Sequence, residues 1–260
     1  GKKGITNYLK AMHHVTLATA AGAKIIRNRI PQANIGTTFS CTHIEPATDS
    51  QKDIEAAKRV DTLLNRTFIE PILGLGYPQK DLPVLKKLNN YILEDDLNNL
   101  NFDFDFIGIQ CYTREIVKSA MLIPYIGAEL VSAEKRNVIS TEMGWEVYPP
   151  ALYHVLKKFN EYEGIRKIII TENGAAFPDT VTNGKVYDIK RTHYIQDHLE
   201  QILKAKNDGL NVEGYFVWSL TDNFEWAEGY NARFGLIHVD FETQKRTIKN
   251  SGLWFKDFLS

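Results

Sequence analysis

The stretch Lys167-Ile168-Ile169-Ile170-Thr171-Glu172-Asn173-Gly174 is an apolar, β-branched run that ends in a carboxylate, an amide and a glycine. Such a run predicts a buried strand. Because it is continuously apolar, it is typical of parallel sheets that helices cover. Glu172 would then lie at the carboxyl end of the strand, where side chains leave the core of an α/β barrel and meet substrate. Position alone fits a catalytic carboxylate and a solvated glutamate equally well.

Working outward from this stretch, three further apolar runs predict strands over residues 33–39, 104–110 and 212–220. Apolar residues at helical spacing predict the helices between them. These helices cover residues 7–27, 53–68, 151–162, 187–208 and 250–259, with shorter pieces at 84–93 and 94–100. Residues 40–50 and 113–148 are expected to be loops, the second shaping a rim or a lid.

Helices and strands alternate along the whole chain, which is typical of a parallel sheet with right-handed crossovers. No glycine-rich nucleotide-binding motif follows any strand, so a doubly wound sheet is less favoured. A (β/α)8 TIM barrel usually takes about 250 residues, but only four convincing strands occur among the 260 residues here. We therefore expect an α/β fold in which residues 1–260 form one domain, either a half barrel or the carboxyl-terminal portion of a whole barrel.

The composition excludes several kinds of partner. A formal net charge of −1 gives no electrostatic reason to expect nucleic acid or an anionic membrane. No run approaches the roughly 20 apolar residues that a membrane span needs. Cys41 and Cys111 lie too far apart in sequence to build a disulfide framework, which favours a reducing, cytoplasmic location. The sequence begins with Gly1 and not with Met, so the lack of a signal segment does not exclude secretion.

A second notable stretch follows the last predicted strand, where residues 218–230 read Trp-Ser-Leu-Thr-Asp-Asn-Phe-Glu-Trp-Ala-Glu-Gly-Tyr. Carbohydrate sites need this mixture, because sugar rings present C–H faces to aromatic rings and hydroxyls to polar groups. The alternative is a buried aromatic cluster that supports a loop, and it is strong for Phe224. It is weaker for Glu225 beside Trp226, because a buried acid must find a partner.

Other candidate groups are less convincing. The seven histidines show no metal-ligand spacing, so neither a metal nor a cofactor is expected. Ser219 lacks the context of a nucleophile elbow, and Cys111 fits an inert buried thiol better than a reactive one. Glu45 and Glu70 each precede a proline and could be catalytic acids. We discount Glu70 strongly because it follows a helix, and Glu45 moderately because it follows a possible strand end.

Five ordered segments together resemble glycoside hydrolase family one, the retaining β-glucosidases and β-galactosidases. They are residues 143–149, 170–174, 218–226, 230–235 and 249–251. The resemblance implies a (β/α)8 barrel of which this chain supplies roughly the second half. It also implies hydrolysis of terminal, non-phosphorylated β-D-glycosides through a covalent glycosyl-enzyme intermediate, the substrates being small oligosaccharides or aryl and alkyl β-glycosides.

The same resemblance implies roles for individual residues. Glu172 matches the nucleophile that attacks the anomeric carbon, and Tyr112 matches the tyrosine that hydrogen-bonds this carboxylate and keeps it ionised. Glu225 and Trp226 match the pair that binds the outer hydroxyls of the sugar. An acidic residue at position 225 also disfavours phosphorylated sugars, because the two negative charges repel.

Three aromatic residues complete the expected pocket. Trp218 resembles the wall beneath the sugar ring, Phe234 matches an aromatic residue near the pocket floor, and Trp145 lies in the segment that borders the aglycone entrance. The family usually shows Asn-Tyr-Tyr where this chain has Gln110-Cys111-Tyr112. The hydrogen bonds made by Gln110, which is still expected to bind substrate, are therefore open.

A larger departure concerns the second catalytic carboxyl group. Retaining glycosidases need one about 5–5.5 Å from the nucleophile, and the family carries it in an Asn-Glu-Pro motif that does not occur in these 260 residues. We therefore expect a complementary N-terminal half of the barrel to be required, since half a barrel leaves edge strands open, and the isolated chain to be inactive. The alternative is a noncatalytic sugar-binding or assembly module, which would gain little from keeping Glu172.

Overall fold

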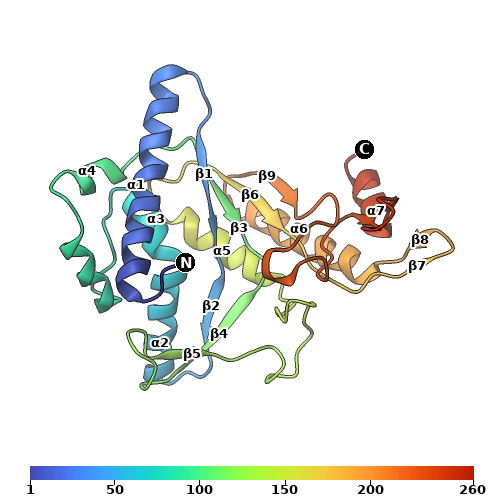
Figure 1. The fold of residues 1–260 in the computed structure, drawn as a ribbon, viewed down its shortest axis with the longest axis horizontal. Helices are drawn as coiled ribbons and strands as arrows, with labels where there is room; N and C mark the ends of the chain where they lie inside the picture. The colour runs from blue at the N-terminus through green and yellow to red at the C-terminus, as the bar shows by residue number, and fades with distance from the viewer.

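The computed structural model describes residues 1–260 and is organised around a four-stranded parallel sheet (Figure 1). Its strands, in spatial order, are β1 (Gly36–Ser40), β3 (Phe106–Gln110), β6 (Ile168–Asn173) and β9 (Val212–Val217). Every neighbouring pair is parallel. All four predicted strands are confirmed with shifted ends, and they follow one another across the sheet in sequence order.

Helices connect these strands, as the alternating pattern predicts. The α-helices are α1 (Ile5–Arg29), α2 (Gln51–Asp61), α3 (Thr67–Ile72), α4 (Asp96–Leu100), α5 (Pro150–Asn160), α6 (Ile189–Asn207) and α7 (Asn250–Phe258). A π-helical turn (Thr62–Arg66) joins α2 to α3, so the helix predicted over 53–68 continues to Ile72. Two 3-10 helices cover Pro83–Asn90 and Trp226–Glu228. None of these helices combines the length and the apolar character needed to cross a bilayer.

The two regions expected to be loops contain a second sheet, so that prediction is wrong. Strands β2 (His43–Pro46), β4 (Arg114–Ser119) and β5 (Ala128–Leu130) form it, with β2 and β4 parallel and β4 and β5 antiparallel. In Figure 1 this sheet lies below the main sheet, next to α2. Val117 packs there against Ala56, Ala57 and Val60 of α2. The strands are short and mostly half-buried, so no apolar run marks them in the sequence.

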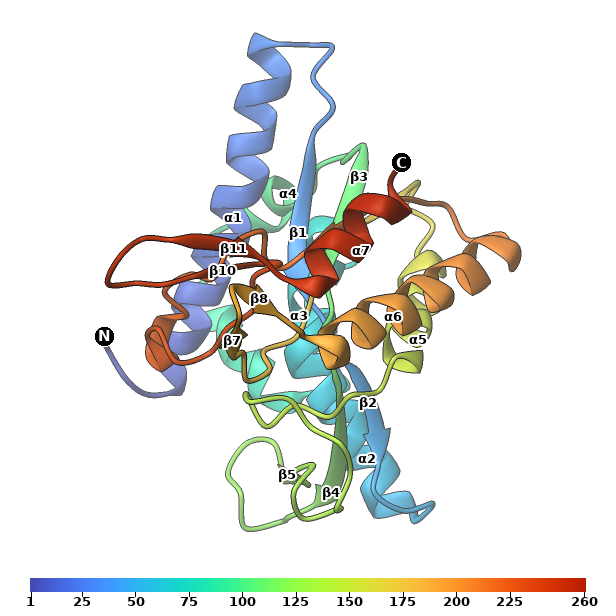
Figure 2. The same ribbon diagram turned by 90° about the vertical axis from the view of Figure 1, so that its right-hand side faces the viewer.

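Two hairpins were also absent from the sequence prediction. They are β7–β8 (Val181–Thr182 with Lys185–Val186) and β10–β11 (Ile237–Val239 with Arg246–Ile248). Figure 2 shows both on the side of the sheet where α6 and α7 lie. They are too short to show a periodic pattern.

The largest core lies between the main sheet and α5. Ile109 of β3 and Ile170 of β6 are fully buried against Leu152 and Leu156 of that helix. The opposite face of the sheet is only partly covered, since Phe216 of β9 is 61% exposed. Burial of the strands on both faces, expected from their continuous apolar character, is therefore absent from these 260 residues.

The partly covered face has a layered arrangement across three strands. Thr38 of β1 and Thr171 of β6 are joined by a hydrogen bond of 2.5 Å between their hydroxyls, over Gly108 of β3. A Cβ atom at position 108 would lie 2.8 Å from side-chain atoms of both threonines. Layers of side chains from alternate strands fill the interior of a (β/α)8 barrel, and this face of the sheet has the same arrangement.

Candidate active site

Glu172 lies at the carboxyl end of β6, paired in register with Gln110 on β3. Its Oε1 accepts a hydrogen bond of 2.8 Å from Nε2 of Gln110, and its Oε2 accepts one of 2.5 Å from the hydroxyl of Tyr112. The carboxylate is thus held through both oxygens by side chains from β3 and the residues that follow it. The hydrogen bond left open for Gln110 goes to Glu172 in this structure.

Tyr112 donates to Glu172 as a neutral phenol. Burial, followed by the hydrogen bond to the Glu172 carboxylate, raises the pKa of Tyr112 far above its ordinary value. Its proton therefore stays on the phenol oxygen at physiological pH and remains available for donation. The pair keeps a fixed polarity, with Tyr112 as donor and Glu172 as acceptor.

Buried amide and phenol groups whose contacts were not predicted from the sequence hold the backbone next to Tyr112 and Glu172. Asn173 is fully buried and donates to the carbonyl of Cys111 at 2.6 Å. Its own side-chain oxygen accepts from the hydroxyl of Tyr215 at 2.8 Å. The hydroxyl of Tyr194, on α6, donates to the carbonyl of Tyr112 at 2.7 Å. These bonds join β3, β6, β9 and α6 just where the strand registers shift.

Gly174 brings the end of β6 into contact with the loop after β9. The backbone N–H of Trp218 donates to the carbonyl of Asn173 at 2.9 Å. A Cβ atom at position 174 would lie only 1.8 Å from the carbonyl oxygen of Trp218. Only glycine allows this approach. The strand predicted to carry the nucleophile (β6, the nucleophile strand) and the loop predicted to bind sugar (residues 218–230, the sugar-binding loop) are therefore adjacent.

The predicted aromatic residues gather beside Glu172. The ring centroid of Tyr112 lies 5.2 Å from that of Trp145 and 6.2 Å from that of Phe234, and Trp218 packs against the same cluster. Phe234 is 1% exposed, so it supports the other rings from beneath and presents almost no surface of its own. Aromatic side chains from segments far apart in the sequence thus form one cluster next to Glu172.

Glu225 is half-buried at the rim of the same region. Its Oε2 accepts a hydrogen bond of 3.2 Å from the side-chain amide of Asn223, the partner that a partly buried acid requires. Trp226 is 82% exposed, so most of its indole surface is free to contact a ligand. Phe224, for which a buried core position was the stronger expectation, is 57% exposed and contacts Tyr230, so that expectation is wrong.

The discounted candidates have structural partners. Glu45 forms an ion pair with Arg114 and contacts the ring of His43, and Glu70 pairs with Arg66. The thiol of Cys111 is fully buried, and this burial raises its pKa to about 12, which leaves it protonated and unreactive. None of these groups competes with Glu172 as the reactive side chain.

Comparison with known proteins agrees with this geometry. The model of the family described as glycosyl hydrolase family 1 matches residues 1–260. The chain is 39% identical over 261 residues to a 1,4-beta-D-glucan glucohydrolase of Thermotoga neapolitana, covering 100% of this chain and 58% of that protein. It is 37% identical over 259 residues to beta-glucosidase A of Thermotoga maritima, covering 99% of this chain and 57% of that protein.

The fold agrees as well. The solved structure of the family 1 β-glucosidase from Thermotoga maritima superimposes with a TM-score of 0.88 at 37% identity, over 96% of this chain and 56% of that one. The chain therefore spans less than three fifths of the length of the relatives it matches, and its parallel sheet is part of a (β/α)8 barrel. The resemblance seen in the sequence is confirmed, and the chain belongs to glycosyl hydrolase family 1.

Proposed function

We propose that this chain carries the nucleophile and part of the sugar pocket of a retaining β-glycosidase of the β-glucosidase type. The observation that carries the proposal is the Glu172 carboxylate at the carboxyl end of β6, with Gln110 and Tyr112 each donating to one of its oxygens. A carboxylate held in this way is ready to attack and does not need to reorient. The relatives named above support a β-glucoside substrate.

In the proposed reaction, a carboxylate oxygen of Glu172 forms a bond to the anomeric carbon while the bond to the glycosidic oxygen breaks. The leaving oxygen takes a proton from a second carboxyl group, which afterwards removes a proton from the water that hydrolyses the glycosyl-enzyme. Tyr112 and Gln110 hold Glu172 in line with the sugar, and Tyr112 keeps its proton throughout. Two displacements on opposite faces of the carbon preserve its configuration.

We propose that the second carboxyl group comes from outside these 260 residues. No Asn-Glu-Pro sequence occurs in them, and Glu45 and Glu70 are occupied by arginine partners. We propose that a complementary barrel segment, in the same polypeptide or a separate one, pairs with the free edge of β1 and supplies this acid. Residues 1–260 would then act as one domain, the carboxyl-terminal half of the barrel, and would be inactive by themselves.

For the substrate we propose a terminal, non-phosphorylated β-D-glycoside in a small oligosaccharide or an aryl or alkyl glycoside. Glu225 and Trp226 would bind its outer hydroxyls, Trp218 and Trp145 would contact the sugar ring and the aglycone, and Phe234 would support them. A phosphate on the sugar would face the Glu225 carboxylate, which makes its binding unfavourable.

A mechanism-based label tests this proposal. A 2-deoxy-2-fluoro-β-glucoside with a dinitrophenolate leaving group needs little acid assistance, so it should glycosylate Glu172. Its fluorine should slow hydrolysis of the glycosyl-enzyme, which then accumulates. Peptide mapping of the chain with its complementary segment should find the label on the peptide that contains Glu172. The Glu172→Gln variant should carry none.

The alternative of a noncatalytic sugar-binding module gives a different result. Such a module would bind a glucose analogue without acquiring a covalent label, even with the complementary segment present. Labelling at another carboxylate would also contradict the role proposed for Glu172.

A further inference from the structure

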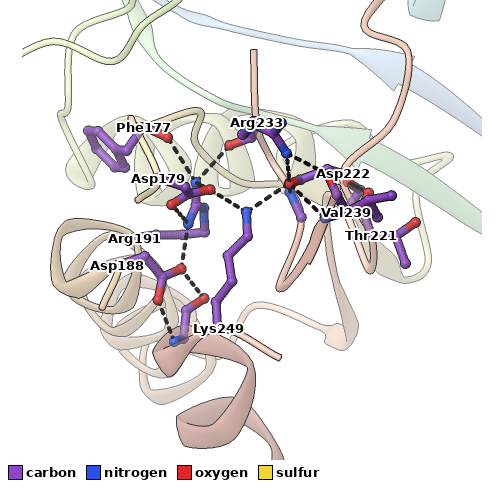
Figure 3. A network of polar contacts seen from close by, with 12 residues as sticks. Phe177, Asp179, Asp188, Arg191, Thr221, Asp222, Arg233, Val239 and Lys249 are labelled. Carbon is purple, nitrogen blue, oxygen red and sulfur yellow. Dashed lines mark hydrogen bonds and ion pairs between the residues drawn. The ribbon is translucent and has the colours of Figure 1, made fainter. Parts of the chain in front are cut away.

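A buried group of charged side chains includes Asp222 of the sugar-binding loop, and Figure 3 shows how its members connect. We call it the ion network, and it consists of Asp179, Asp188, Arg191, Asp222, Arg233 and Lys249. Every member except Arg233 has a side chain that is at most 1% exposed. Acids and bases are equal in number, so no buried ion is left without a counter-charge.

Lys249 lies at the centre of the network. Its Nζ donates to Asp222 Oδ1 at 2.7 Å and also to the carboxylate of Asp179, and solvent does not reach it. Desolvation lowers the pKa of Lys249, and Asp179 and Asp222 oppose that effect. Lys249 is therefore the group that joins the two aspartates.

Asp222 is held by donors from several directions. Besides Lys249, it accepts from Arg233 Nη1 at 2.7 Å and from the backbone N–H groups of Gly235 at 3.0 Å and Val239 at 3.2 Å. Burial works to raise the pKa of Asp222, but Lys249 and Arg233 hold it below its ordinary value. A carboxylate with this many fixed donors has a single orientation, and the backbone at residue 222 is fixed with it.

The network connects the two halves of the candidate site. Asp179 follows β6 and the Gly174 contact, whereas Asp222 lies between β9 and Glu225 in the sugar-binding loop. Lys249 comes from a third segment, immediately before α7. The nucleophile strand and the sugar-binding loop are thus linked to each other through this lysine.

A short relay leads from Asp222 to Glu225. The next residue, Asn223, accepts a hydrogen bond of 3.2 Å from Ser219 Oγ and donates one of 3.2 Å to Glu225 Oε2. A shift of the backbone at residue 222 would carry Asn223 with it and would reorient the Glu225 carboxylate.

We propose that Lys249 is a positioning residue that sets sugar selectivity: by holding Asp222 beside Asp179, it orients Glu225 toward the outer hydroxyls of the bound sugar. This inference rests on the function proposed above. A lysine with only a structural role would change stability and leave selectivity intact. A positioning lysine changes the preference for sugars that carry those hydroxyls over sugars that lack them.

The test compares two binding probes on these 260 residues together with the complementary barrel segment. One probe is a gluco-configured iminosugar, and the other is its xylo-configured counterpart, which lacks the hydroxymethyl group. Dissociation constants are measured by calorimetry at a temperature where circular dichroism shows every variant folded. Lys249→Met should reduce the ratio of the two constants by about tenfold or more, because the site no longer hydrogen-bonds the distinguishing hydroxyl.

Conservative and control variants separate positioning from stability. Lys249→Arg keeps the charge and should restore the ratio to within about threefold of the unmodified protein. Lys158→Met removes a lysine of α5 that pairs with Asp61 of α2, and should leave the ratio unchanged. If Lys249→Met does not fold, Asp222→Asn replaces it with the same expected loss of selectivity.

The outcomes distinguish this inference from the proposed function. If the unmodified protein prefers the gluco probe and the Lys249→Met variant shows the same preference, the positioning role of Lys249 is wrong and the proposed function is unaffected. An unmodified protein that binds neither probe would overturn the proposed function, and the positioning role with it.

Discussion

Tyr112 and Gln110 hold different oxygens of Glu172, so each donor can be removed separately. Tyr112→Phe deletes the hydrogen bond of 2.5 Å to Oε2 and keeps the ring among the neighbouring aromatic side chains. We expect glycosylation of Glu172 by the fluoroglucoside to slow by about 10²-fold, the usual effect of losing one preorganised donor at a reacting group. Tyr153→Phe, which deletes a surface hydrogen bond to Asp208, is the control and should label at the unmodified rate.

Gly174 allows a second prediction at the residue scale. Gly174→Ala would push a methyl group into the carbonyl of Trp218 and should destabilise the protein by about 1–3 kcal/mol or more, as overpacking does. Gly22→Ala is the matched control, because a methyl group there would meet no atom within 4 Å and alanine favours a helix such as α1. Urea unfolding of the chain together with its complementary segment should show a loss of stability for Gly174→Ala and none for Gly22→Ala. Equal stability of the two variants would contradict the close contact.

At the scale of elements, α6 carries a buried histidine beside Tyr194, whose hydroxyl donates to the carbonyl of Tyr112. His198 is fully buried, its ring stacks on Tyr194 with centroids 3.9 Å apart, and it hydrogen-bonds the Tyr194 carbonyl. Desolvation lowers the pKa of His198 to about 4. The unfolded chain, with a histidine pKa of about 6.5, therefore binds a proton at pH values where the folded chain does not.

Stability should consequently fall as the pH drops through the interval between these two pKa values. Linkage gives a loss of about 3 kcal/mol when the pH falls from about 6.5 to about 4, because the unfolded state binds more protons there. His198→Gln should remove this part of the pH dependence, as measured by urea unfolding of the chain with its complementary segment across the interval. An unchanged slope in the variant would show that other groups cause the acid loss.

The elements that the sequence predicted are those with a continuous or periodic run of buried apolar residues. Ile168 to Ile170 and the apolar face of α5 mark their structures because each packs on an adjacent layer. Strands β2, β4 and β5 gave no such signal, because they are short and mostly half-buried and therefore contain no apolar run.

In the candidate site, too, the sequence indicated individual residues but not the contacts between residues far apart in the chain. Glu172, Tyr112 and the aromatic residues were indicated by family motifs, and the structure brings Glu172 and Tyr112 together. The contacts of Asn173 with Tyr215 and of Lys249 with Asp179 were not foreseen, because they join residues 42 and 70 positions apart. Only the folded backbone defines such pairs.

At the scale of the whole molecule, the main sheet has two free edges, because β1 and β9 each pair with a single neighbour within it. Free edges and an uncovered interior face favour association with other chains. We expect these 260 residues alone to self-associate in sedimentation experiments and to bind a hydrophobic dye. Addition of the complementary segment should abolish both effects and give one cooperative unfolding transition. A compact, cooperatively unfolding monomer without that segment would contradict the half-barrel proposal.

The hydroxyl contact between Thr38 and Thr171 over Gly108 has a consequence for how this sequence can diverge. A side chain at position 108 would collide with both threonines, so it can be accommodated only where both of them give way. Glycine at position 108 is therefore coupled to the two threonines across three strands. Related chains that keep both threonines should keep this glycine, although no two of these residues are close in sequence.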